Sequence, residues 1–343
     1  MRMSKTIALV LNAILLMSCG IVPAAGAQID LTQKMQAREY RDPEISRNIV
    51  LPYRIYVPST YDENQSYRVL LWLHGNSGRG EDNSLHVIDE KDMTLLLRRV
   101  IADEKLSEQF IVVAPQCPSN DKWVDAGYYP GYYALDKTPQ TIPSQLVMSL
   151  MQKELPQNYN IDPDRIYISG ISMGGYGTWD LICRYPDFFA AAMPVCGGAD
   201  PLRAETISHM PIWTAHSQGD SIVRPVGTNG MVKRLTALEA DITYTNTDPH
   251  GHDAWMPFYQ EPTLLDWMVS KTRIARAQSS TPSDPAQSQA DNQIGSVPSH
   301  SSEPDQDTKK AFPFGWLIGA AAAVAVIGTA VSVIAIKKRK KKQ

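Results

Sequence analysis

Residues 68–73 have the sequence RVLLWL, in which every side chain after the first is apolar. A strand that is apolar on both faces must be covered on both sides, as in the parallel sheets of α/β proteins. Similar runs alternate with segments of helical spacing, which predicts an α/β fold with a mostly parallel central sheet flanked by helices. We expect strands at 49–58 (antiparallel), 68–73, 110–114, 165–169, 190–196, 211–216 and 242–247, and helices at 94–102, 144–155, 173–184, 226–240 and 264–274.

The first 27 residues (1–27) have the pattern of a secretory signal peptide. Arg2 and Lys5 precede an apolar run, and the small residues of 25–27 (AGA) form a cleavage site. As an alternative, Cys19 ends a sequence similar to a lipobox and would carry a lipid.

Three segments are expected after the globular part. Residues 275–315 are rich in Ser, Pro, Gln and Asp without an apolar period, which predicts a disordered linker. Residues 316–336 carry no charge and, at about 1.5 Å per residue, are long enough for a transmembrane helix across a ~30 Å apolar core. Residues 337–343 begin with six basic residues, typical of a cytoplasmic tail. We therefore expect a single-pass cell-membrane protein with an extracellular globular domain.

The remaining residues, 28–274, have the length of one large α/β domain. Between residues 28 and 336 the chain has all 36 of its acidic residues but only 25 of its 33 basic ones, a balance of −11. This negative balance argues against a nucleic-acid partner. The cysteines of this part, Cys117, Cys183 and Cys196, are odd in number and lack metal-ligand spacing. We expect buried thiols, with a Cys183–Cys196 disulfide as the alternative.

Residues 170–174 (GISMG) form a G-x-S-x-G sequence between a predicted strand and a predicted helix. In this context the serine occupies a strained turn that exposes its hydroxyl, and the glycines lie where strand and helix approach too closely for a Cβ atom. A serine hydroxyl is a weak nucleophile, so it needs a base, a group that orients the base, and donors for the oxyanion. We expect Ser172 to be a catalytic nucleophile.

The order serine, acid, histidine along the chain is typical of this strand–turn–helix arrangement. Asp220 follows a predicted strand in a glycine-containing turn and is the expected acid, ahead of Asp200 and Asp248. The base then lies in the sequence DPHGHDAW, as either His250 or His252. Position alone does not separate these two histidines.

The oxyanion donors are expected to be backbone N–H groups. One comes from the residue after the nucleophile, Met173, and the other from the loop after the 68–73 strand. We assign the second donor to Asn76. His74 is expected to be a structural ring that hydrogen-bonds its own loop.

Together these stretches resemble the α/β-hydrolase esterases related to polyhydroxybutyrate depolymerases, dienelactone hydrolases and so-called predicted peptidases. The resemblance runs from about Tyr53 to Met268 and is most specific in the long block 161–200. Its other parts are LLWLHGNSGRGEDN (70–83), VVAPQCPSNDKW (112–123), HSQGD (216–220) and GHDAW (251–255). It implies the α/β-hydrolase fold for nearly the whole globular domain.

The resemblance also implies roles for single residues. Ser172 corresponds to the nucleophile, Asp220 to the acid and His252 to the base, which leaves His250 in reserve. Trp123 resembles an aromatic residue at the rim of the family's pocket. The family's substrates include short acyl esters, hydroxycinnamoyl esters on plant polysaccharides, acetylated sugars and polyesters. The chain departs from the family in the Asn-Ser sequence that follows His-Gly and in its C-terminal apolar segment.

We therefore expect a surface-anchored serine carboxylesterase that needs no metal or organic cofactor. Its partner would be a small-molecule or polysaccharide-linked ester. Trp123, Trp255 and Tyr128 are expected to line the substrate pocket. The alternatives are a serine peptidase with the same triad and a non-catalytic surface-binding module with the hydrolase fold.

Overall fold

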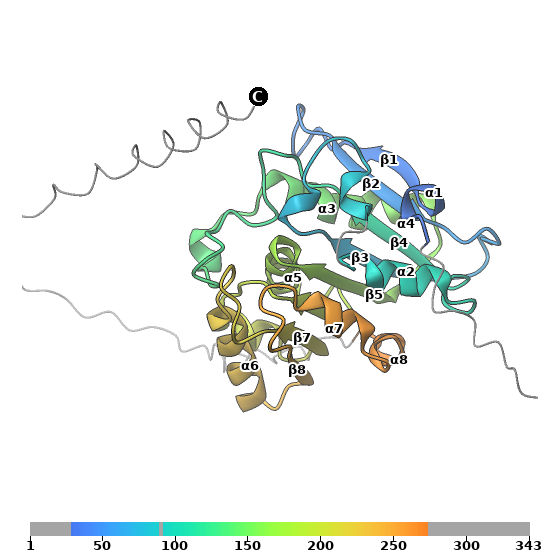
Figure 1. Cartoon of the computed structure of the whole chain (residues 1–343). Coiled ribbons are helices and arrows are strands. Elements are labelled where there is room, and N and C mark those ends of the chain that lie inside the picture. The colour runs from blue at the N-terminus through green and yellow to red at the C-terminus, as the bar shows by residue number, and fades with distance from the viewer. Residues whose placement is uncertain (1–28, 89–91, 274–343) are drawn as a thin grey trace, which may run out of the picture. The chain divides into compact units, whose positions relative to one another are not determined.

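The computed structural model describes residues 29–88 and 92–273 (Figure 1). The predicted signal peptide, linker, membrane helix and basic tail therefore lie outside the described residues. Within the described ranges, no helix is long and apolar enough to cross a bilayer.

The described residues form an eight-stranded sheet in the order β1-β2-β4-β3-β5-β6-β7-β8. The pairs β1–β2 and β2–β4 are antiparallel, whereas all later neighbours are parallel. This confirms the prediction of a mostly parallel sheet with an early antiparallel strand. The strands are β1 Gln36–Tyr40, β2 Leu51–Tyr56, β3 Tyr67–Leu73, β4 Phe110–Pro115, β5 Ile161–Ile171, β6 Ala191–Val195, β7 Ile212–His216 and β8 Ile242–Asn246.

Helices cover both faces of this sheet (Figure 1). They are α1 Leu31–Lys34, α2 Leu95–Ala102, α3 Ile142–Ser149, α4 Leu155–Asn158, α5 Met173–Arg184, α6 Val226–Ala237, α7 Trp255–Gln260 and α8 Leu264–Ser270, with short 3₁₀ turns at Asn76–Gly78, Leu85–Val87, Leu135–Lys137 and Pro201–Ile207. The apolar side chains of α3, α5 and α6 join one core layer, and those of α1, α2, α7 and α8 join the other.

The side chains of β3 explain why two layers are needed. Leu71 and Leu73 pack in the layer of α5, while Leu70 and Trp72 pack in the layer of α2 and α7. All four are at most 1% exposed. Because burying each such side chain contributes about 1.5–3 kcal/mol, this run is stable only in a sheet covered on both faces.

The helix predicted at 144–155 does not stop at Pro156. After α3 the chain makes a π-helical turn at Leu150–Glu154, in which the N–H of Leu155 donates to the carbonyl of Leu150, five residues back. Pro156 then lies in the first turn of α4. The N–H groups of a first turn have no partner within their helix, so proline can occupy this position without losing a hydrogen bond. The wider turn therefore lets the helical path continue past the proline.

The strand β1 was not expected from the sequence. The sequence QAREY of β1 gave no strand signal because four of its five side chains are exposed, and the strand is held by its ladder to β2.

Cys183 and Cys196 are free and buried, as is Cys117. The expectation of buried thiols is confirmed, and the alternative of a Cys183–Cys196 disulfide is wrong.

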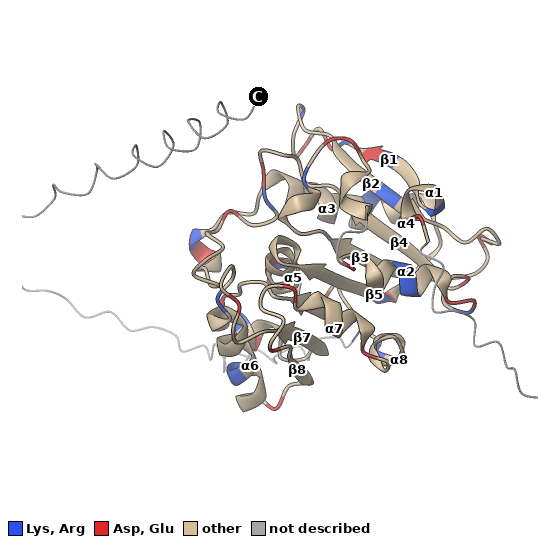
Figure 2. Cartoon of the chain, viewed as in Figure 1, with Lys and Arg blue, Asp and Glu red and all other residues tan. Residues whose placement is uncertain are grey.

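Charged residues of both signs are interspersed on the described elements (Figure 2). Many form short pairs, such as Lys153 with Glu44 at 3.1 Å and Arg273 with Asp164 at 2.7 Å. Because exposed pairs of this kind contribute at most about 1 kcal/mol, the apolar layers rather than the charges stabilise the fold.

Candidate active site

Ser172 lies in a tight turn between β5 and α5. Its backbone has φ 53° and ψ −114°, and side-chain-bearing residues seldom adopt a positive φ. The N–H of Ser172 donates to the carbonyl of Val195 at 3.0 Å, and its own carbonyl accepts from the N–H of Tyr176 at 3.0 Å. A conformation of this kind costs on the order of 1–3 kcal/mol, so both neighbouring elements hold the residue in place.

Gly170 and Gly174 allow this turn to approach β3 closely. A Cβ atom on Gly174 would lie 1.9 Å from the carbonyl oxygen of Leu73, and one on Gly170 would lie 2.5 Å from the carbonyl oxygen of Gly174. Both separations are far below van der Waals contact. Any larger residue would therefore have to move the backbone that positions Ser172.

Three side chains form a continuous hydrogen-bonded chain at the carboxyl edge of the sheet. His252 Nε2 lies 2.8 Å from Ser172 Oγ, and His252 Nδ1 lies 2.8 Å from Asp220 Oδ2. Because the carboxylate can only accept, Nδ1 carries the proton and donates to Asp220, which leaves Nε2 free to accept from the Ser172 hydroxyl. We name this arrangement the Ser172–His252–Asp220 chain.

The Asp220 carboxylate is fixed in the orientation that this chain requires. Its Oδ1 accepts from the N–H groups of Ile222 at 2.9 Å and Val223 at 3.0 Å, and its side chain is fully buried. Burial alone raises the pKa of Asp220, but hydrogen bonds from His216 and His252 outweigh it. The pKa of Asp220 therefore lies below its ordinary value, and the group is ionised at neutral pH.

His216 is a second histidine on Asp220, and the sequence did not indicate it because it precedes the acid. Its Nε2 lies 3.2 Å from Asp220 Oδ2 and 2.9 Å from the carbonyl of Val223, and both of these atoms are acceptors. Its Nδ1 lies 3.0 Å from Thr228 Oγ1, which itself donates to the carbonyl of Gly197. Both ring nitrogens thus lie within hydrogen-bond distance of polar partners, which hold the buried ring beside the Asp220 carboxylate.

We expect His216→Gln to lower kcat/KM about fivefold while retaining the fold. The flexible glutamine amide holds a donor near the Nε2 position less firmly than the imidazole ring does, which weakens the hydrogen bond to Asp220 by about 1 kcal/mol. The weaker hydrogen bond also raises the pKa of Asp220 towards its ordinary value of 3.8, so stability that is present above that pH should decrease.

The measurement is kcat/KM together with the free energy of unfolding at pH 7 and at pH 3. The matched control is His209→Gln, since His209 is largely buried and its Nε2 contacts only Pro186 and Asp187 among the described residues. An unchanged kcat/KM in His216→Gln would show that the hydrogen bond from His216 does not act through Asp220.

The loop that carries His252 is tied to the loop that carries Asp220. The Asp248 carboxylate accepts from the Ser217 hydroxyl and, at 3.1 Å, from the N–H of Gly219. The Trp255 ring packs edge-on against His252 with the ring centroids 5.8 Å apart. His250, the reserve base, is exposed and does not line the cleft that contains Ser172; its N–H donates to the carbonyl of Thr247 at 2.9 Å.

The loop after β3 is supported by His74. Its Nε2 accepts from the N–H of Cys117 at 2.9 Å, so its Nδ1 carries the proton and donates to the carbonyl of Gly75 at 2.6 Å. Burial lowers the pKa of His74 to about 4, and the ring is neutral. The expectation of a structural His74 is confirmed. Asn76, the proposed oxyanion donor, follows directly and lines the same cleft as Ser172.

Trp123 does not line the cleft, which corrects its expected place at the pocket rim. The side chain is 1% exposed, donates from Nε1 to the carbonyl of His74 at 3.1 Å and packs edge-on against the His74 ring. Trp123 thus packs beneath the loop after β3 and supports it. Within the described residues, no group of three or more His, Cys, Asp or Glu side chains could hold a metal ion.

Residues 48–278, about two thirds of the chain, match the family model described as "Putative esterase". The chain belongs to this esterase family. A solved thermostable esterase is 31% identical, with a TM-score of 0.61, and the match covers 71% of this chain and 64% of that one. A solved ferulic acid esterase is 16% identical, with a TM-score of 0.50 over 68% of this chain and 98% of that one, and shows the shared fold alone. The predicted α/β-hydrolase fold is confirmed.

Curated relatives match this chain over shorter stretches. Poly(3-hydroxyalkanoate) depolymerase C of Paucimonas lemoignei is 40% identical over 53 residues, 16% of this chain and 13% of that protein. A bifunctional acetylxylan esterase/xylanase of Neocallimastix patriciarum is 29% identical over 180 residues, 52% of this chain and 23% of that protein. The chain thus spans less than a quarter of either relative.

The cleft that contains Ser172 has a volume of about 400 Å³ and opens to solvent. Its lining includes Ser172, His252, Tyr128, Ile222 and Trp255, which come from loops at the carboxyl edge of the sheet. Tyr128 and Trp255, which the sequence predicted as pocket residues, thus line the same cleft as Ser172. Burial raises the pKa of the Tyr128 phenol to about 12, so this ring is uncharged at the cleft wall.

Proposed function

We propose that this esterase is a serine carboxylesterase whose catalytic groups are Ser172, His252 and Asp220. The hydrogen-bonded chain from the Ser172 hydroxyl through His252 to the ionised Asp220, in an open cleft, carries the proposal. This is the geometry that activates a serine hydroxyl by general-base catalysis.

In the proposed reaction, Ser172 Oγ attacks the ester carbonyl carbon as its proton passes to His252 Nε2. The backbone N–H groups of Met173 and Asn76 donate to the oxyanion, and each such donor typically contributes ~3–4 kcal/mol to lowering the barrier. When the carbon–oxygen bond of the ester breaks, the His252 proton passes to the leaving alkoxide oxygen. A water molecule, activated by His252 in the same way, then releases the acid and restores Ser172.

The substrate class is a carboxylic ester with a short acyl, acetyl or hydroxycinnamoyl group, carried by a small alcohol or a polysaccharide. The names of similar proteins support this range, since they include a poly(3-hydroxyalkanoate) depolymerase, an acetylxylan esterase and a ferulic acid esterase. The proposal includes a cell-surface location, which rests on the apolar sequence 316–336 and the basic residues after it.

The test is hydrolysis of p-nitrophenyl acetate, methyl ferulate and a peptide p-nitroanilide by the purified full-length protein. We expect turnover of at least one ester and a kcat/KM for the amide that is lower by about 100-fold or more, because an amine is a poorer leaving group than an alcohol. Faster cleavage of the amide would favour a peptidase. Inactivity on every ester would favour a binding module that keeps the hydrolase fold.

A further inference from the structure

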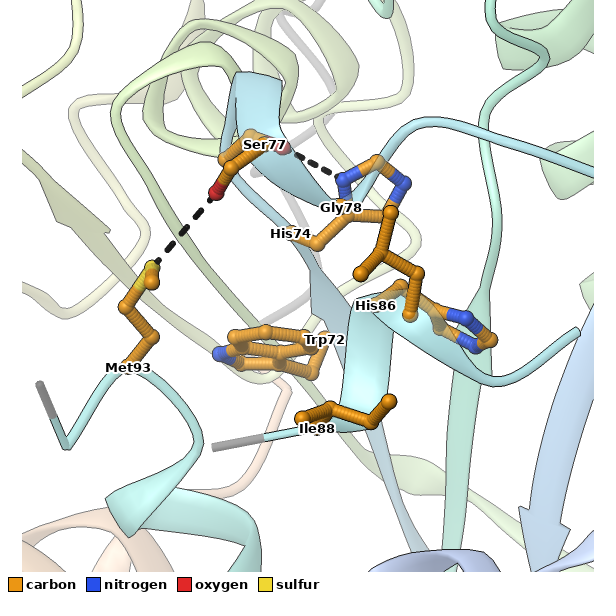
Figure 3. A pocket seen from close by; sticks show the side chains of 9 residues that line it. Trp72, His74, Ser77, Gly78, His86, Ile88 and Met93 are labelled. Atoms are coloured by element: carbon orange, nitrogen blue, oxygen red, sulfur yellow. Dashed lines mark hydrogen bonds between the residues drawn. The ribbon is translucent and has the colours of Figure 1, made fainter. Parts of the chain in front are cut away.

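A second cavity lies beside the cleft, beneath the loop that follows β3 (Figure 3). It has a volume of about 90 Å³, against about 400 Å³ for the cleft. Its apolar lining comes from Trp72 near the end of β3 and from Leu85, Ile88 and Met93 in the connection to α2. Figure 3 shows the Trp72 indole between Ser77 and Ile88, with Met93 at its side.

The cavity and the cleft share part of their lining. Gly75, Ser77 and Met93 line both spaces, whereas Ser172 and His252 line only the cleft. Gly75 and Ser77 flank Asn76, whose N–H is the proposed oxyanion donor. The cavity therefore begins beside the proposed oxyanion donor, and His252 takes no part in its lining.

This position decides which part of an ester could enter the cavity. His252 must deliver its proton to the leaving oxygen, so the alcohol has to lie on the His252 side of the carbonyl carbon. The group on the opposite side is the acyl chain. A substrate bound for reaction would thus direct its acyl chain past Ser77 and Met93.

The lining favours an uncharged aliphatic group. Both nitrogens of His74 are used by the backbone, and His86 Nε2 donates to the carbonyl of Ala114 at 2.9 Å. Burial lowers the pKa of His74 to about 4 and that of His86 to about 3, so both rings are neutral. This space of about 90 Å³ is smaller than an apolar cavity of about 150 Å³ that binds benzene, so a short aliphatic group fits it more readily than an aromatic ring does.

We propose that this cavity is the acyl subsite and that it selects aliphatic acyl groups of about two to four carbons over hydroxycinnamoyl groups. The inference rests on the proposed esterase function and deepens it, because it narrows the acyl part of the substrate. The alcohol part would contact the other end of the cleft.

The test changes Met93, which stands between the two spaces, in opposite directions. Met93→Trp narrows the entrance and Met93→Ala widens it, and Ile222→Ala truncates an apolar residue that lines only the cleft. Each full-length variant is assayed on p-nitrophenyl acetate, butyrate and hexanoate, and on methyl butyrate and methyl ferulate, which share one alcohol.

In the unsubstituted protein we expect kcat/KM to be highest for acetate or butyrate and lower for methyl ferulate than for methyl butyrate. Met93→Trp should lower the butyrate-to-acetate ratio of kcat/KM about tenfold, and Met93→Ala should raise the hexanoate-to-butyrate ratio about tenfold, since a methylene in an apolar pocket is worth at least that factor. The Ile222→Ala control should keep both ratios within about twofold. A ratio does not depend on the fraction of folded enzyme.

Two outcomes would overturn the acyl subsite while leaving the esterase proposal intact. The first is ester hydrolysis with acyl ratios that the Met93 variants do not change. The second is a preference of the unsubstituted protein for methyl ferulate over methyl butyrate. Absence of all ester hydrolysis would instead overturn the proposed function itself.

Discussion

Replacing Ser172 with alanine is expected to lower kcat on p-nitrophenyl acetate by about 10⁴- to 10⁶-fold, into the background rate. The substitution removes the oxygen that forms the acyl-enzyme. Among the described residues, no second hydroxyl lies within hydrogen-bond distance of His252 Nε2 to replace it. Ser172 lies at the N-terminus of α5 and its side chain caps no backbone group there. The free energy of unfolding should therefore change by less than about 1 kcal/mol.

The measurement is burst and steady-state release of p-nitrophenol at equal concentrations of folded protein. Ser270→Ala is a matched control, because Ser270 is an exposed serine at the end of α8 that donates to the carbonyl of Trp267. If Ser172→Ala remained as fast as the unsubstituted protein, the serine mechanism would have to be abandoned.

The second large effect is expected from a pair of substitutions in one loop. His252→Ala should lower kcat by about 10⁴- to 10⁶-fold, because it removes both the general base and the partner of Asp220. His250→Ala, two residues away, should leave kcat within about twofold, because its exposed ring lies outside the cleft lining. The two variants are controls for each other, since both shorten a histidine in the same loop.

Stopped assays over pH 5 to 9 would compare the two variants, and added imidazole should restore part of the activity of His252→Ala. A large loss in His250→Ala with a small loss in His252→Ala would contradict the choice of base. Equal losses would indicate that the loop as a whole has been disturbed.

The parts of this protein that depend on nearby residues could be predicted from the sequence. The apolar run in β3 requires cover on both faces, and the glycines around Ser172 reflect contacts with the adjacent strand. By contrast, the choice between His250 and His252 depends on how the loop folds back over β7. Sequence position could not decide it, and the family resemblance was needed.

Other features depend on contacts between residues that are far apart in the chain. His216 precedes the acid, so a search by chain order excludes it, although the fold places its ring on Asp220. Trp123 has the composition of a pocket residue but donates to the carbonyl of His74, 49 residues away, and is buried. The exposed sequence of β1 contains no apolar period, and only its pairing with β2 makes it a strand.

The two neutral histidines near the loop after β3, His74 and His86, affect how kinetic data on this protein should be interpreted. Because the pKa of His74 is about 4 and that of His86 about 3, neither ring binds a proton between about pH 5 and 9. An inflection of the pH–rate curve in that interval therefore belongs to the substrate or to groups other than these two rings. Two imidazoles that line the cavity beside the cleft are thus silent in the experiment commonly used to identify a catalytic histidine.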